Sequence, residues 1–200
     1  MKVRSRSLKT TNSEPRTAWY QMKLFPTERT ESTYTRLWRF VYNILPAIRG
    51  TGSWLTFMSA DWKEAHVRLP LSLRTRNYVG TIFGGALFAA TDPIYMVMLI
   101  KVLGGENYVV WDKTAKIRFL QPGKGKLKAH FFLEESLVDK LKEQVAEHNS
   151  TNHTFTITWL NQQDKPVARI EKTVYIGDRK HYEAKRAARG QVGQKVPKRF

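Results

Sequence analysis

The chain has 200 residues, of which 42% are apolar, which is enough for one domain with a real core. It contains no cysteine, which excludes a disulfide framework and a thiol nucleophile and leads us to expect a cytoplasmic protein. The net charge of +17 lies mainly at the ends: residues 1–50 hold ten Lys/Arg against three Asp/Glu (+7), residues 178–200 hold eight against two (+6), and the middle holds sixteen against twelve (+4).

The N-terminal residues 1–26 are rich in Ser, Thr, Arg and Lys and show no sustained hydrophobic period, so we expect a flexible basic arm. No apolar h-region follows the first cations, so the segment does not predict a secretory signal. We expect the folded domain to span residues 27–177. A basic tail is expected over 178–200.

An amphipathic helix is expected over residues 31–45, and Pro46 closes it. Its apolar stripe recurs at helical spacing and consists of Tyr34, Leu37, Trp38, Val41, Tyr42 and Leu45. We expect this stripe to pack on the domain. A helix lying on a membrane surface is the alternative, because Arg36 and Arg39 flank the aromatic face.

Six further segments alternate apolar and polar residues as strands do. They lie at 53–59, 64–70, 107–120, 127–133, 153–159 and 168–176. A loop is expected over 71–82, a long apolar helix over 83–103 and a short helix over 137–148. The order β-β-α-β-β-α-β-β predicts an α+β fold in which an antiparallel sheet wraps around one long central helix.

Two of these strands predict which side chains share a face. In the 107–120 segment we expect one apolar face, with Lys113 as its exception, made of Val109, Trp111, Ala115, Ile117 and Phe119. In the last segment the expected apolar face consists of Ala168, Ile170, Val174 and Ile176.

The long apolar run over residues 82–100 holds a single charge, Asp92, which Pro93 follows. A carboxylate there must have a partner or a shifted pKa, because burying an unpaired charge is strongly unfavourable. The run could span a membrane by length. Against this, a central Asp costs about 2.5–3.5 kcal/mol on insertion scales, and the strands need a partner for their apolar faces. We therefore expect a buried core helix.

The start of this helix carries a recognisable pattern. It reads Asn77, Tyr78, Val79, Gly80, Thr81, Ile82, Phe83, Gly84, Gly85, and Asp92 follows seven residues after the second glycine. The pattern resembles the signature of the hotdog-fold thioesterase superfamily, particularly the phenylacetyl-CoA thioesterase-like branch, which reads Asn-x-x-Gly-x-x-His-Gly-Gly followed by an Asp. Phe83 stands at the position of the family's His.

A closer resemblance covers about residues 30–177. Segments 77–93, 111–113, 118–123 and 171–175 resemble a bacterial family that is catalogued as a domain of unknown function and regarded as a candidate tetrameric acyl-CoA thioesterase. Both resemblances imply the hotdog fold, with an extra N-terminal helix in this chain, and an activity on acyl-CoA thioesters.

The resemblance also implies site roles. Asp92 matches the family's base or nucleophile, and the Gly84 N–H matches its oxyanion donor, at a helix N-terminus where backbone N–H groups lack partners. Asn77 fits as a group that positions the water or the thioester oxygen. The alternatives stay open: the glycines allow close helix packing, Asp92 bonds polar groups across a dimer seam, and Asn77 has a loop or cap role.

The spacing of Gly84 and Asp92 predicts an oligomer. Eight residues of a continuous helix at about 1.5 Å each separate them by about 12 Å, which one side chain cannot bridge. If both groups act on one thioester, they must come from different subunits. We therefore expect a homodimer with sites between subunits, as hotdog thioesterases have; a tetramer is the alternative.

Substrate contacts are expected from Phe83 and Gly85 beside the glycine turn. The cations of the following segment could meet the phosphates of coenzyme A, with a solvated strand face as the alternative; they are Lys113, Lys116, Arg118, Lys124 and Lys126. The five histidines lack metal-ligand spacing, so we expect no metal and no cofactor other than the coenzyme A of the substrate.

The sequence thus predicts a homo-oligomeric hydrolase that cleaves acyl-CoA thioesters with water activated at a carboxylate. A non-catalytic acyl-CoA or lipid-binding hotdog module is the first alternative, suggested by Phe83. Binding of nucleic acid or an anionic membrane through the two basic ends is the second.

Overall fold

The structure is a computed structural model, and it describes residues 25–188. The N-terminal arm predicted over 1–26 therefore lies outside the described residues, except for its last two. The described elements are α1 (Thr33–Ile44), α2 (Pro46–Thr51), β1 (Trp54–Met58), β2 (Glu64–Pro70), α3 (Gly84–Ala89), α4 (Ile94–Leu103), β3 (Tyr108–Phe119), β4 (Lys126–Phe132), α5 (Glu135–His148), β5 (Ser150–Leu160), β6 (Pro166–Asp178) and α6 (Arg179–Ala188).

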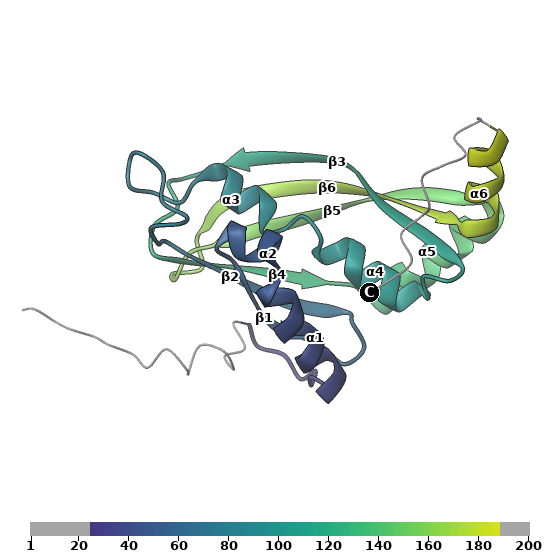
Figure 1. Cartoon of the computed structure of the whole chain (residues 1–200), viewed down its shortest axis with the longest axis horizontal. Coiled ribbons are helices and arrows are strands. Elements are labelled where there is room, and N and C mark those ends of the chain that lie inside the picture. The colour runs from purple at the N-terminus through teal and green to yellow at the C-terminus, as the bar shows by residue number, and fades with distance from the viewer. Residues whose placement is uncertain (1–24, 189–200) are drawn as a thin grey trace, which may run out of the picture.

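The predicted α+β fold with an antiparallel sheet is confirmed. The six strands pair antiparallel in the order β1-β2-β4-β5-β6-β3, so β1 and β3 are the edges. Figure 1 shows α3 and α4 lying across one face of the sheet, while α1 runs beside β1. The sequence did not predict α2, nor α6, which forms the first part of the predicted basic tail.

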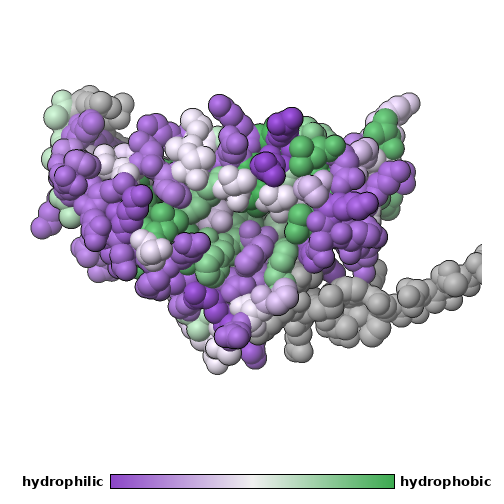
Figure 2. Space-filling model, turned by 180° about the vertical axis from the view of Figure 1, so that it is seen from behind, coloured by the Kyte–Doolittle hydropathy of each residue, from purple (hydrophilic) through white to green (hydrophobic). Residues whose placement is uncertain are grey.

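The core lies between the sheet and the central helix. Met98 and Leu99 of α4 are fully buried and belong to one cluster with Phe131 and Trp159 of the sheet. The indole Nε1 of Trp159 donates to the Leu87 carbonyl at 2.9 Å, which fixes α3 on the sheet. The face of the molecule that lies behind the view of Figure 1 is largely hydrophilic, with hydrophobic residues gathered near the centre of the view (Figure 2).

The central helix predicted over 83–103 is present but interrupted. Residues 90–93 form a turn between α3 and α4, in which the Asp92 N–H bonds the Ala89 carbonyl at 3.2 Å. Pro93 has no N–H to continue the helical ladder. The interruption places Asp92 at a surface turn.

Within the described chain, the stretch Gly84–Leu103 is long and apolar enough to cross a membrane by length and composition. Half of it is buried inside the domain, and a core helix passes the same test. The packing against the sheet is the arrangement expected of a core helix.

The prediction that the apolar stripe of α1 packs on the domain holds only in part: of this stripe, Tyr42 belongs to the core and Trp38 packs against it. The residues that α1 buries are Thr35, Arg39, Tyr42 and Asn43. Most of the predicted stripe is exposed, with exposed fractions of 58% for Tyr34, 61% for Leu37, 45% for Val41 and 46% for Leu45.

The free edge of β1 explains this orientation, because unpaired strand groups need polar partners. The Asn43 side chain accepts from the Leu55 N–H at 2.9 Å and donates to the Leu55 carbonyl at 2.8 Å. The Met58 N–H donates to Glu31 at 3.0 Å, and Arg39 holds that carboxylate at 2.7 Å. The polar face of α1 therefore docks on the strand edge, with Tyr42 beside it in the core.

A β-bulge between Asp112 and Thr114 changes the faces of β3. One extra residue reverses the alternation, so Asp112 points inward. Trp111 is 37% exposed, and Lys113 points outward to Asn152. The prediction that Trp111 shares the inner face with Ile117 is therefore wrong.

Candidate functional site

A buried lysine joins two carboxylates at the turn between α3 and α4. Lys172 of β6 points inward, and its Nζ lies 2.9 Å from Asp92 Oδ1 and 2.8 Å from Asp112 Oδ2. It also donates to the Asp92 carbonyl. The lysine side chain is 2% exposed, so this cation is satisfied by the pair of aspartates.

The two aspartates have different environments. The Asp92 side chain is 58% exposed, whereas that of Asp112 is 23% exposed. Burial raises the pKa of Asp112, the Lys172 hydrogen bond and charge oppose this, and the charge of Asp92 adds to the rise. In the described part of the chain, the buried Asp112 Oδ1 has no hydrogen-bond partner. Asp92 is thus the carboxylate that can meet solvent and substrate.

The negative charge of Asp92 also acts on the hydroxyl of Tyr42 in α1. Burial raises its pKa well above the ordinary value, and the negative charge of Asp92 raises it further. Its hydroxyl therefore stays protonated at neutral pH.

The two glycines begin α3. Phe83 is the N-cap residue and supplies no side-chain cap, so the first N–H groups of the helix have no partner within it. A Cβ at Gly84 would lie 2.7 Å from the Phe119 ring, and one at Gly85 would lie 2.3 Å from the Phe83 ring. Within residues 25–188, the N–H groups of the two glycines therefore have no backbone partner and lie beside two phenyl rings, which suits a carbonyl attached to an apolar group.

Asn77 organises the loop that precedes the glycines. Its amide Nδ2 donates to the Thr81 hydroxyl at 2.8 Å, and its Oδ1 accepts from the Thr81 N–H at 2.9 Å. Gly80 between them has φ +82°, which glycine adopts readily. These bonds give Asn77 the loop role that the sequence left open, and a role toward the thioester stays a prediction.

The predicted phosphate-binding cations are not gathered around Asp92 within one chain. Lys113 and Arg118 are exposed on the outer side of β3, and Lys124 is exposed in the turn that follows. Asp92 is tied to the inner side of the sheet through Lys172. A role for these cations would need a substrate that reaches around the edge of the sheet.

Sequence reasoning missed Asp112 and Lys172. The signal for Lys172 was present, because this lysine falls between Ile170 and Val174 on the apolar face of its strand. A charge at such a position predicts a buried partner. The signal for Asp112 was indirect, because Lys113, which interrupts the alternation of this strand, lies at the bulge that turns Asp112 inward.

Apolar side chains are exposed around the start of α3. They belong to the 71–83 loop and to the end of β3: Leu73 (91%), Tyr78 (104%), Val79 (75%), Phe83 (57%), Phe119 (57%) and Leu120 (43%). β3 pairs with β6 on one side and is an edge strand on the other. A free strand edge next to exposed apolar groups is a common protein interface.

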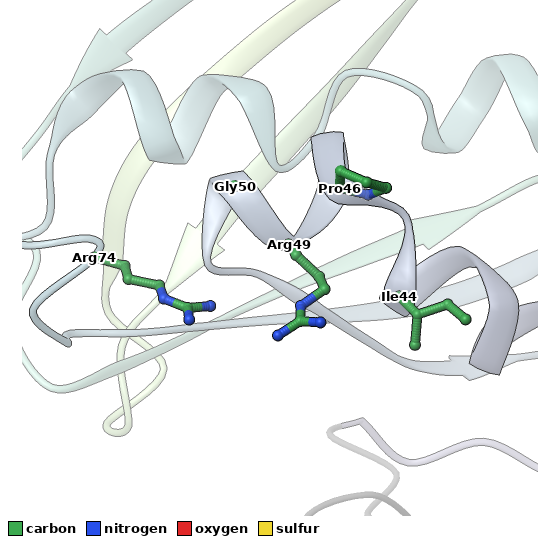
Figure 3. Close-up of a pocket in the computed structure, with 5 residues that line it drawn as sticks. All are labelled: Ile44, Pro46, Arg49, Gly50 and Arg74. Atoms are coloured by element: carbon green, nitrogen blue, oxygen red, sulfur yellow. The ribbon is translucent and has the colours of Figure 1, made fainter.

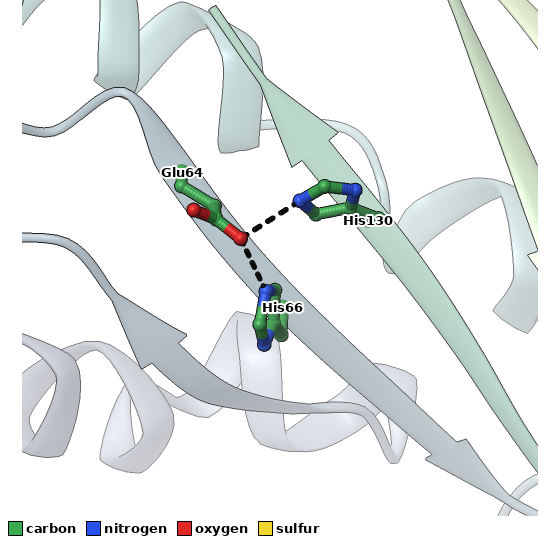
Figure 4. Close-up of side chains that lie close together, drawn as sticks. All are labelled: Glu64, His66 and His130. Atoms are coloured by element: carbon green, nitrogen blue, oxygen red, sulfur yellow. Dashed lines mark hydrogen bonds and ion pairs between the residues drawn. The ribbon is translucent and has the colours of Figure 1, made fainter. Parts of the chain in front are cut away.

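A second cluster has the donor set of a metal site. Glu64 and His66 of β2 and His130 of β4 converge, with their ligand atoms within 4.8 Å of one another (Figure 4). The two imidazoles lie 2.9 and 3.0 Å from Glu64 Oε1, while Oε2 accepts from Thr27 at 2.6 Å and lies 3.7 Å from Arg29. Both carboxylate oxygens already have partners and a cation is adjacent, so Glu64 is the central acceptor of a hydrogen-bond network.

The comparisons with known proteins agree with this architecture. The family model described as Domain of unknown function (DUF4442) matches residues 35–176. A protein of unknown function from Pseudomonas aeruginosa, described as a probable thioesterase, has 17% identity and a TM-score of 0.65, covering 72% of this chain and 95% of that chain. A thioesterase from Haemophilus influenzae has 16% identity and a TM-score of 0.53, covering 75% and 94%. No curated protein matches the sequence. These likenesses confirm the hotdog fold.

Proposed function

Because this chain belongs to the DUF4442 family and has the hotdog fold, we propose that it hydrolyses acyl-CoA thioesters at sites built by two copies of the chain. The observation that carries the proposal is Asp92: a solvent-exposed carboxylate, held in place by a buried lysine, on the helix pair that begins with two free N–H donors. The thioesterase descriptions of the structural neighbours support the same reaction class.

In the proposed reaction, Asp92 takes a proton from a water molecule whose oxygen attacks the thioester carbon. The Gly84 N–H donates to the oxyanion of the tetrahedral intermediate. The C–S bond then breaks and releases the carboxylic acid and a thiolate, which takes the proton back from Asp92 to give the free thiol. The leaving thiolate needs little assistance, because the pKa of a thiol is about 8.5. Lys172 acts on the reaction through Asp92, whose orientation it fixes.

The partner copy is expected at the free edge of β3. This edge and the exposed apolar groups of the 71–83 loop would be covered by a second chain, and the start of α3 would then meet the partner's Asp92 turn. A dimer is the smallest assembly that completes two such sites.

A thiol-release assay across a panel of acyl-CoA substrates tests the function. Asp92→Asn should lower the rate by at least about 100-fold, because general-base catalysis contributes about 10²–10⁴-fold. Asp164→Asn is the matched control, since Asp164 is also exposed and ion-paired, to Lys128 at 2.7 Å. Full activity of Asp92→Asn would refute the proposed base.

A non-catalytic acyl-CoA-binding module is the second candidate, and the Phe83 ring favours it. The ring lies over Gly85 and is 57% exposed, so it offers apolar surface where the family pattern has a His. This candidate predicts that acyl-CoA raises the melting temperature while no thiol is released.

A further inference from the structure

The exposed face of α1 is unusually apolar for a protein surface. Six large hydrophobic side chains form one contiguous arc on this helix; we name it the α1 apolar face, and it consists of Tyr34 (58% exposed), Leu37 (61%), Phe40 (49%), Val41 (45%), Ile44 (48%) and Leu45 (46%). Contiguous apolar patches on a monomer mark interaction sites. The helix cannot turn this face inward, because Asn43 and Arg39 on its other side hold the edge of β1.

Unpaired cations border the α1 apolar face. Arg49 of α2 and Arg74 of the 71–83 loop line a shallow pocket with Ile44, and the Arg74 side chain extends toward Arg49 (Figure 3). Neither guanidinium has an acidic partner among residues 25–188. Leu73, next to Arg74 in the chain, is 91% exposed. Apolar and cationic groups therefore alternate at this end of the helix.

The surrounding sequence carries little negative charge. Between residues 32 and 91 the acidic residues are Asp61 and Glu64. Both face Arg29, which pairs with Asp61 and lies 3.7 Å from Glu64. Glu31 at the start of α1 pairs with Arg39 and lies 4.0 Å from Arg36. The uncompensated positive charge therefore lies at the other end of the helix, around Arg49 and Arg74.

We propose that the α1 apolar face docks on an anionic lipid membrane, with Leu37, Val41 and Ile44 entering the interface and Arg49 and Arg74 binding lipid phosphates. Amphipathic helices with a cationic border bind membranes in this way, through buried apolar area and attraction to anionic headgroups. The proposal is independent of the hydrolase reaction and of the two basic chain ends.

The charge pattern favours lipid over other occupants. A second copy joined by a two-fold axis near Arg49 and Arg74 would bring this cationic border close to itself, and residues 65–91 contain no Asp or Glu to offset the repulsion. Nucleic acid binding depends mainly on many cation–phosphate contacts, whereas most of the α1 apolar face is aliphatic and only its border carries cations.

Vesicle flotation with the full chain tests the proposal. Wild type should float with vesicles of 70% phosphatidylcholine and 30% phosphatidylglycerol and should stay largely unbound with phosphatidylcholine alone. The double variant Leu37→Asp/Ile44→Asp keeps both basic ends and the buried face of α1, so it should lose binding at least about tenfold. Arg49→Glu/Arg74→Glu should lower partitioning at least about 30-fold, since each lost cation near an anionic surface removes about 1 kcal/mol and each new carboxylate is repelled.

Matched variants separate the site from general charge. Lys140→Glu/Lys142→Glu makes the same charge change on the exposed face of α5 and should retain much more binding than Arg49→Glu/Arg74→Glu. Phe132→Asp introduces one such charge at an exposed apolar position on β4 and should bind like wild type. Circular dichroism and melting temperature confirm that each variant is folded.

Three results would overturn the proposal. Wild type that fails to float, or Leu37→Asp/Ile44→Asp that floats like wild type, would remove α1 from membrane binding; the second result would assign binding to the basic ends. If wild type does not float, and light scattering shows that Leu37→Asp/Ile44→Asp dissociates an oligomer that wild type forms, the α1 apolar face is a contact between copies.

Discussion

Asn43 bonds the backbone of Leu55 in both directions, through Nδ2 to the carbonyl at 2.8 Å and through Oδ1 to the N–H at 2.9 Å. The side chain thus replaces the neighbour strand that the edge of β1 lacks. Asn43→Ala would leave both Leu55 groups buried without partners, because Asn43 is 2% exposed and Leu55 is 1% exposed. We expect a loss of about 2–4 kcal/mol in the free energy of unfolding by urea denaturation.

The control for this edge is Asn152→Ala, which removes an exposed amide from β5 and should change stability by less than about 0.5 kcal/mol. Asn43→Asp can still accept from the Leu55 N–H but cannot donate to its carbonyl. Hydrogen exchange at the Leu55 amide should therefore stay slower in Asn43→Asp than in Asn43→Ala. Equal exchange in both would show that the bond to the N–H contributes nothing.

Lys172→Met should destabilise the fold by about 3 kcal/mol at neutral pH, because removing one partner of a buried ion pair leaves the other uncompensated. Asp112 would bear most of this cost, since its Oδ1 is already buried without a partner in the described chain. Lys128→Met, which breaks the more exposed pair with Asp164, should cost less than about 1 kcal/mol.

A second substitution tests the origin of that cost. Asp112→Asn in the Lys172→Met background removes the stranded charge, so the double variant should be more stable than Lys172→Met alone. If the double variant is less stable than Lys172→Met alone, Lys172 stabilises the fold mainly through packing and the bond to the Asp92 carbonyl.

Gly84→Pro removes the proposed oxyanion donor and should keep the start of the helix, although its Cβ, like that of alanine, displaces the Phe119 ring. Proline is favoured at the first position of a helix, and Phe83 before it already has φ −61° and ψ 130°, which suits a residue that precedes proline. Thiol release should fall by about 10²–10³-fold. Gly84→Ala keeps the N–H but displaces the Phe119 ring, so equal activity of the two variants would exclude the N–H from the reaction.

Mixed oligomers test whether Asp92 and Gly84 act from opposite chains. If they do, each hybrid dimer of Asp92→Asn and Gly84→Pro subunits contains one intact site, and an equal mixture after subunit exchange should recover about one quarter of wild-type activity, by the two-fold symmetry of the pair. A mixture as inactive as its components, with hybrids demonstrated by mass spectrometry, would place both groups in one chain.

Most of the fold was predictable because its signals are local. The alternation over 64–70 coincides with β2 residue for residue, and Gly104 ends the central helix in the left-handed conformation that glycine favours. The site was less predictable because Lys172 reaches Asp92 across 80 residues of sequence. Lys113, the residue that interrupts the alternation in β3, marks the bulge that turns Asp112 inward.

The predicted orientation of α1 was only partly right, for a different physical reason. A hydrophobic stripe normally identifies the buried face of a helix. Here the partner is a strand edge whose N–H and C=O groups require polar side chains, so Thr35, Arg39 and Asn43 face the domain. The periodicity of the sequence describes the helix alone, so it does not show that the neighbouring strand edge requires polar side chains.

Glu64 should make stability depend on acid pH. Burial raises its pKa, but hydrogen bonds from Thr27, His66 and His130 outweigh this and hold the pKa below the ordinary value of 4.5. A carboxyl whose folded pKa is depressed stabilises the fold above its unfolded pKa, and this contribution is lost as pH falls through the folded pKa. Glu64→Gln should therefore cost about 1–3 kcal/mol at pH 7, and the difference from wild type should shrink toward pH 3.

Urea unfolding at pH 7, 5 and 3 measures this dependence. Glu147→Gln is the matched control, because the Glu147 side chain is 74% exposed on α5 and should show no such trend. A Glu64→Gln cost that is the same at all three pH values would mean that the charge of Glu64 is not what stabilises the fold. The carboxylate would then matter only through its shape and packing between β2 and the 25–29 segment.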